Sequence, residues 1–111
     1  MVKTITLDNF SGARVSSGQL LAGDEITWSF TVPADATGDG RIEFTNNASP
    51  NVGITATHGG KPEFGMLDVD IQLHHLQPGE VKTVTTKVDG DTQAGISAAL
   101  SIKRQHGKKH P

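Results

Sequence analysis

Asp68-Val69-Asp70-Ile71-Gln72-Leu73-His74 alternates polar and apolar residues without a break. A period of two is the pattern of a β-strand with one buried face. The same alternation runs through residues 25–32 and 96–103, and no segment spaces its apolar residues at a helical period over ten residues. We therefore predict an all-β protein without a helix longer than about two turns.

Eight strands are expected, near residues 2–8, 13–21, 24–33, 40–46, 51–58, 66–75, 80–88 and 94–103. The gaps contain turn residues such as Gly23-Asp24 and Gln77-Pro78-Gly79-Glu80, in which glycine permits a positive φ and proline fixes a negative one. Strands joined by short polar turns are typical of antiparallel sandwiches and not of βαβ units. The sequence thus predicts an antiparallel immunoglobulin-like β-sandwich of seven or eight strands. We expect Trp28 to be buried, because its position in the alternation places its side chain on the inward face of the strand.

The 111 residues fit one domain, which we expect to span 1–103, followed by a flexible basic tail at 104–111. Residues 1–102 contain all 12 acidic residues and six of the ten basic ones, which leaves a net charge of −6. An acidic body disfavours nucleic-acid binding. The tail is interpreted either as a solubilising end, as an arm that touches an anionic partner, or as a metal-binding segment through His106 and His110.

The absence of cysteine excludes disulfides and thiolate chemistry. No charged segment followed by an apolar run is seen at the start, and the longest apolar run is too short to span a membrane. The chain is therefore expected to be cytoplasmic as written, or secreted if a leader has been removed.

Three segments resemble a known group of proteins. They are GDEITWSFTV at 23–32, IEFTNN at 42–47 and LQPGEVKTVT at 76–85. Together they are similar to the bacterial immunoglobulin-like adhesion and surface modules, and the resemblance covers residues 20–103. It implies a non-catalytic module that binds, spaces or assembles.

The segment HGGKPEFG at 58–65 is the longest expected irregular loop. Binding residues concentrate on loops that a rigid scaffold holds, so His58, Lys61, Glu63 and Phe64 are predicted to contact a partner. The alternative is a plain connection between strands. His74, on the expected outer face of the 66–75 strand, is the fifth predicted binding residue.

An enzyme is the weaker alternative, as a small metal-dependent or histidine-dependent hydrolase using His58, His74 or His75. Asp70 and His74 would lie about 13 Å apart along one strand, too far to share an ion. His75 has the inward parity of Leu73 and is expected at the sheet end. We accordingly predict no catalytic residue, no metal and no cofactor. The predicted function is a binding or assembly module for a protein or carbohydrate partner, with homo-oligomerisation through sheet edges or a sheet face.

Overall fold

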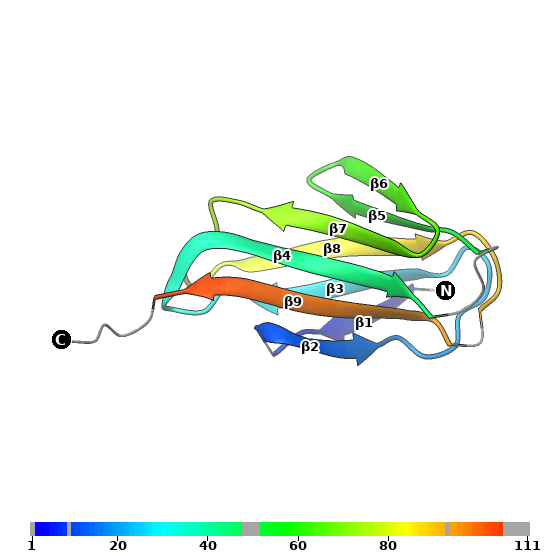
Figure 1. Cartoon of the computed structure of the whole chain (residues 1–111), viewed down its shortest axis with the longest axis horizontal. Coiled ribbons are helices and arrows are strands. Elements are labelled where there is room, and N and C mark those ends of the chain that lie inside the picture. Colours follow the sequence, from blue (N-terminus) through cyan, green and yellow to red (C-terminus); the bar gives the residue numbers. More distant parts are fainter. Residues whose placement is uncertain (1, 9, 48–51, 93, 106–111) are drawn as a thin grey trace.

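The computed structural model describes residues 2–8, 10–47, 52–92 and 94–105. This part of the chain forms nine strands and no helix, and the strands build two layers (Figure 1). The strands are β1 (Val2–Thr6), β2 (Ser11–Ser16), β3 (Glu25–Thr31), β4 (Ala36–Asn46), β5 (Ile54–His58), β6 (Lys61–Gly65), β7 (Asp68–Leu73), β8 (Val81–Val88) and β9 (Ile96–Arg104). The predicted all-β sandwich is confirmed. No helix able to cross a membrane occurs among these residues.

The five-stranded sheet has the order β1-β3-β8-β5-β6, and the four-stranded sheet has the order β2-β9-β4-β7. All paired strands are antiparallel except β1, which runs parallel to β3. The edge strands β6 and β7 lie on the same side of the sandwich, where they contact one another (Figure 1). Two sheet edges therefore meet there.

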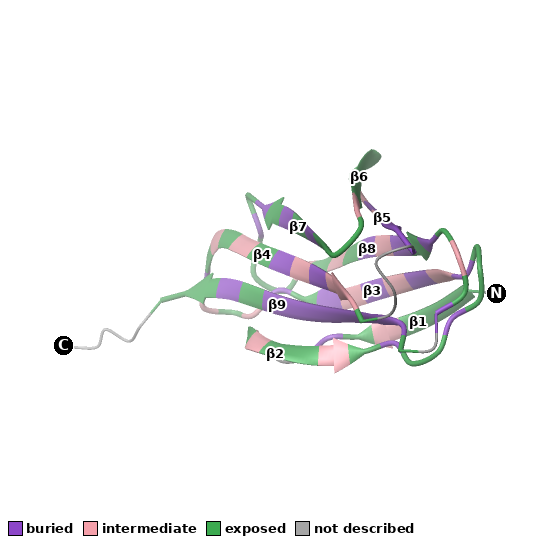
Figure 2. Ribbon diagram, turned by 45° about the vertical axis from the view of Figure 1, so that its right-hand side comes forward, coloured by how far each residue is buried: buried purple, intermediate pink, exposed green. Residues whose placement is uncertain are grey.

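The core lies between the sheets and follows the alternation of the sequence. In β3 the residues Ile26, Trp28 and Phe30 are buried while their neighbours face outward. Trp28 is fully buried, as expected, and its ring centroid lies 5.7 Å from that of Phe44 in the opposite sheet. Figure 2 shows the buried positions alternating along β4, β7 and β3. The outer faces are consequently polar.

The prediction of an irregular loop at 58–65 is wrong, because the segment forms a β-hairpin. Gly59 and Gly60, with φ of 60° and 80°, make the two-residue turn between β5 and β6. Turns of this kind need positive φ at both central residues. The sequence pattern did not predict strand β6, because four of its five residues are exposed and apolar residues therefore do not alternate with polar ones. It brings the strand number to nine.

The ends of two other expected strands also differ. Strand β7 stops at Leu73, and His75 adopts a φ of 58° and is exposed, so its predicted inward position is wrong. Strand β9 continues to Arg104, whose Nε lies 2.7 Å from Asp35 Oδ1. The backbone N–H of Gln105 donates to the carbonyl oxygen of Asp35 at 2.8 Å. The rest of the predicted tail, with His106 and His110, lies outside the described residues.

Candidate functional site

The β5–β6 hairpin carries three of the five predicted binding residues on one face. Lys61 pairs with His58, and Glu63 pairs with Ala56. Because directly paired residues point to the same side of a sheet, His58, Lys61 and Glu63 share the side on which Ala56 is buried. This side looks toward β7.

A hollow of about 320 Å³ lies between this hairpin and the edge of β7. We call it the hairpin hollow, and it is lined by His58, Lys61, Glu63, Asp70, Ile71 and Gln72. Figure 2 shows β6 projecting beyond the body of the sandwich. The sequence alone did not indicate that Asp70 and Gln72 would join the hairpin residues.

Polar groups of the hairpin hollow retain binding capacity. The Nδ1 atom of His58 is buried and has no hydrogen-bond partner among the described residues. The part of the chain described here contains no group of three or more histidine, aspartate or glutamate side chains placed to hold a metal ion. The hollow is therefore suited to hydrogen bonding and ion pairing with a ligand.

Next to the hollow, the end of β6 and the connection from β6 to β7 expose three apolar side chains. Phe64 is 63% exposed, Met66 39% and Leu67 62%. We call these three residues the apolar tip. Phe64 pairs with Thr55, so it points to the side of the hairpin opposite Glu63. Sequence reasoning identified Phe64 but missed Met66 and Leu67, which it placed in a strand at 66–75.

The apolar tip is held in place by the end of β4. The backbone N–H of Asn46 donates to the Leu67 carbonyl at 2.9 Å, and its side-chain Nδ2 donates to the Met66 carbonyl at 3.1 Å. The same Nδ2 also contacts the carbonyl oxygen of Val52. On the other side, the ring of Phe64 lies over Gly53, where an added Cβ would come within 2.7 Å of two ring carbons. The exposed side chains thus stand on a fixed backbone.

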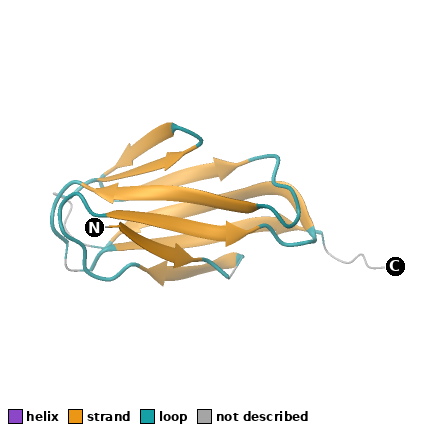
Figure 3. Ribbon diagram, turned by 180° about the vertical axis from the view of Figure 1, so that it is seen from behind, coloured by secondary structure: helices purple, strands orange, loops and turns teal. Residues whose placement is uncertain are grey.

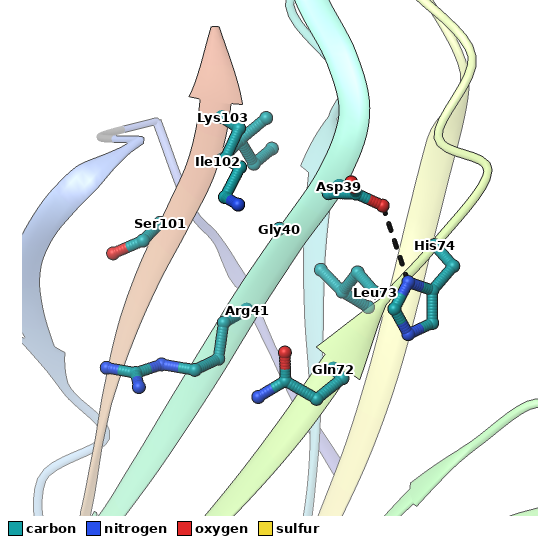
Figure 4. A pocket seen from close by; sticks show the side chains of 9 residues that line it. All are labelled: Asp39, Gly40, Arg41, Gln72, Leu73, His74, Ser101, Ile102 and Lys103. Carbon is teal, nitrogen blue, oxygen red and sulfur yellow. Dashed lines mark hydrogen bonds and ion pairs between the residues drawn. The ribbon is translucent and has the colours of Figure 1, made fainter.

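His74, the fifth predicted binding residue, belongs to a different hollow. This second hollow, of about 450 Å³, lies on the β9-β4-β7 side and is drawn in Figure 4. His74 Nδ1 lies 3.4 Å from Asp39 Oδ1 at its border. Gln72 lines both hollows. His74 and His75 lie close together, with ring centroids 6.5 Å apart, whereas His58 lines a separate recess.

Arg41 of the second hollow differs from the other two arginines. Arg14 reaches Glu43 at 2.6 Å and Arg104 reaches Asp35 at 2.7 Å. No ion pair joins Arg41 to a carboxylate within the described ranges. Its strand neighbours in register are Ser101 and Gln72, both neutral.

Two carboxyl groups with displaced pKa values lie at turns, away from both hollows. The backbone N–H of Leu21 donates to Asp24 Oδ2 at 2.9 Å and lowers the pKa of Asp24. The backbone N–H of Gln77 donates to Glu80 Oε1 at 3.2 Å, and with the nearby Lys82 ammonium it lowers the pKa of Glu80. Both shifts stabilise turns of the scaffold.

No protein-family model and no curated protein matches the chain. Among solved structures, the periplasmic inhibitor of g-type lysozyme PliG from Aeromonas hydrophila is similar, with a TM-score of 0.54 and 15% identity over 92% of this chain and 97% of that one. A mutant of the PliG inhibitor from Escherichia coli gives a TM-score of 0.50 and 15% identity over 93% and 100%. The pre-peptidase C-terminal domain of Bacillus anthracis collagenase gives 0.43 and 16% over 93% and 95%. The two PliG likenesses show the fold.

Proposed function

We propose that this chain is a non-catalytic, immunoglobulin-like module that binds a protein through its β5–β6 hairpin and the β6–β7 connection. The exposure of the apolar tip carries the proposal. Trp28, Phe30 and Phe44 are at most 1% exposed, whereas Phe64 is 63% exposed on strand β6, whose backbone pairs with β5. Exposed aromatic and methionine side chains are enriched at protein interfaces, where a few of them supply most of the affinity.

Charged groups around the tip fit a basic partner. Asp68 follows Leu67 directly, and Glu63 and Asp70 line the adjacent hairpin hollow. The net charge of −6 over residues 1–102 adds a long-range attraction. Such a field raises association rates and depends on salt. We infer that the apolar tip anchors the partner and that the acidic residues around the tip orient it.

The PliG structures suggest a first partner to test. Both are periplasmic inhibitors of g-type lysozyme. We extend the proposal to a g-type lysozyme as the bound protein and to the periplasm or the cell exterior as the location. The fold supports the choice of this partner for a first experiment.

Binding of a purified g-type lysozyme to the immobilised chain tests this function. The triple variant His58→Ala, Lys61→Ala, Phe64→Ala should abolish binding while its melting temperature stays within about two degrees of the parent, because Lys61 and Phe64 are exposed and His58 is only half-buried. Val81→Ala is the matched control, since Val81 is 63% exposed on β8 and lies outside the proposed site. Lack of binding by the parent chain would rule out this lysozyme as partner. Hydrolytic activity lost with His58→Ala would instead favour an enzyme.

Self-association through sheet edges is a further part of the proposal. Strands β1 and β6 end one sheet, and β2 and β7 end the other. An edge strand can pair with another chain through its outer backbone groups. In β6, however, Lys61, Pro62 and Glu63 oppose such pairing. The edge of β7 already contacts β6, so we expect β1 or β2 to be used. Sedimentation at several concentrations should reveal a dimer, and a constant monomer mass would contradict this.

A further inference from the structure

The outer face of the five-stranded sheet is turned toward the viewer in Figure 3. By strand register this face carries many hydroxyl side chains. Alternation in β1, β3, β5 and β8 places nine threonine or serine side chains there. We call this surface the hydroxyl face, and its members are Thr4, Thr6, Thr27, Ser29, Thr31, Thr55, Thr57, Thr83 and Thr85.

The hydroxyls stand in register across the sheet. Thr4 pairs with Thr27, Thr27 with Thr85, and Thr85 with Thr57, which makes one row over four adjacent strands. A second row joins Thr6, Ser29 and Thr83. Neighbouring strands are about 4.8 Å apart. The face is thus a regular grid of hydrogen-bonding groups.

These groups are directed to the outside. None of the nine hydroxyls bonds to another residue within the described ranges, in contrast to the buried Thr86 of the same sheet, which accepts from Trp28 at 2.8 Å. The charges on this face balance each other, because Lys87 Nζ lies 3.4 Å from Glu25 Oε2. The hydroxyl face therefore offers many neutral donors and acceptors and no net charge.

The face is hollowed at one place. A depression of about 370 Å³ is lined by Glu25, Thr55, Thr57, Thr85 and Lys87. Its size falls within the range of about 300–1,000 Å³ that is usual for small-molecule sites. The exposed Phe64 is paired with Thr55 and therefore lies on the same outer side of the sheet as the depression.

We propose that the hydroxyl face binds a neutral polysaccharide, seated on this depression. A threonine hydroxyl donates one hydrogen bond, accepts others and rotates to suit its partner. Sugar hydroxyls have the same dual character, while threonine methyl groups and the Phe64 ring suit the apolar C–H groups of a sugar. A protein partner fits this face less well, because interface centres are rich in aromatic residues, methionine and arginine. An anionic ligand would meet Glu25 beside the lysine.

Affinity electrophoresis in gels that contain hydroxyethylcellulose, xylan or glycol chitin tests this site, with alginate as the charged comparison. The parent chain should be retarded by at least one neutral polymer and not by alginate alone. The double variant Thr57→Val, Thr85→Val keeps side-chain shape and strand preference but removes two hydroxyls. Its affinity should fall about tenfold, as expected for two lost hydrogen bonds.

Two controls make the result specific. Thr6→Val, on the same face but outside the depression, should change affinity less than about twofold, and Thr57→Ser with Thr85→Ser should retain binding because the hydroxyls remain. The proposal would be overturned if no neutral polymer retarded the parent chain, or if Thr6→Val reduced the affinity as much as the double variant. It would also be overturned if the face instead formed a dimer, without polymer, that the valine substitutions disrupt. The valine variants should still bind the protein partner of the apolar tip, so the two functions fail separately.

Discussion

The indole Nε1 of Trp28 donates a 2.8 Å hydrogen bond to Oγ1 of Thr86, and both side chains are completely buried. The two residues lie on the neighbouring strands β3 and β8, in the middle of the five-stranded sheet. Buried polar atoms are costly when they lack partners. This bond therefore fixes how the largest core side chain is oriented.

Removing one partner of this bond should be more harmful than its net strength suggests. Thr86→Val leaves the indole N–H unpaired and should lower the free energy of unfolding by about 1–3 kcal/mol. Trp28→Ala also creates a cavity and should cost about 3–5 kcal/mol. Urea denaturation followed by circular dichroism measures both changes. A Trp28→Ala variant as stable as the parent would show that this side chain does not hold the core.

Substitutions at two glycines distinguish the cost of a strained backbone from the cost of a steric clash. Gly95 has a φ of 72°, and a Cβ there would lie 1.8 Å from the Gly18 carbonyl oxygen and 2.3 Å from Ser17 Oγ. Gly79 has a φ of 84°, but nothing lies within 4 Å of its Cβ position. Gly79→Ala should cost about 1–2 kcal/mol from conformation alone, and Gly95→Ala should cost clearly more. Equal thermal melting of the two variants would argue against the close approach at Gly95.

The pH dependence of stability should depend in part on Asp24. Its pKa is lowered in the folded chain by the hydrogen bond from the Leu21 backbone N–H, so the folded state favours the carboxylate. This stabilisation is complete above the unfolded pKa of about 3.9 and is lost as the pH falls through the lower folded value. Asp24→Asn should therefore melt below the parent at pH 7, and the gap should shrink below about pH 3. A gap that stayed constant with pH would contradict this.

The boundary of the folded unit can be located by truncation. A chain that ends at Gln105 keeps the Arg104–Asp35 ion pair and the bond from Gln105 to the Asp35 carbonyl, so its melting temperature should equal that of the full chain. A chain that ends at Lys103 loses both and should be less stable by about 1 kcal/mol, since exposed ion pairs contribute little. Differential scanning calorimetry distinguishes the two.

Alternation predicted β3, β7 and β9 because one side of each strand faces the core. It failed for β6, whose side chains face solvent or the hairpin hollow, and for the start of β4, where Gly38 and Gly40 accompany a shift of register against β9. His58, Lys61 and Glu63 could be grouped because they lie in one short segment. Asp70 and Gln72 could not, since their approach depends on which sheet edges meet. Local patterns thus identify strands, while the site depends on their order in space.

Because β1 pairs in parallel with β3, strand β1 of one molecule could be replaced by β1 of another. Five residues from Val2 to Thr6 complete the sheet edge, and no tight turn joins them to their partner strand. An equivalent strand from another molecule would reach β3 in the same orientation. If β1 detached, each chain would expose the edge of β3 and would also have an unpaired strand able to pair with the β3 edge of a neighbouring chain. The same geometry that closes the monomer therefore contains the components of a head-to-tail polymer.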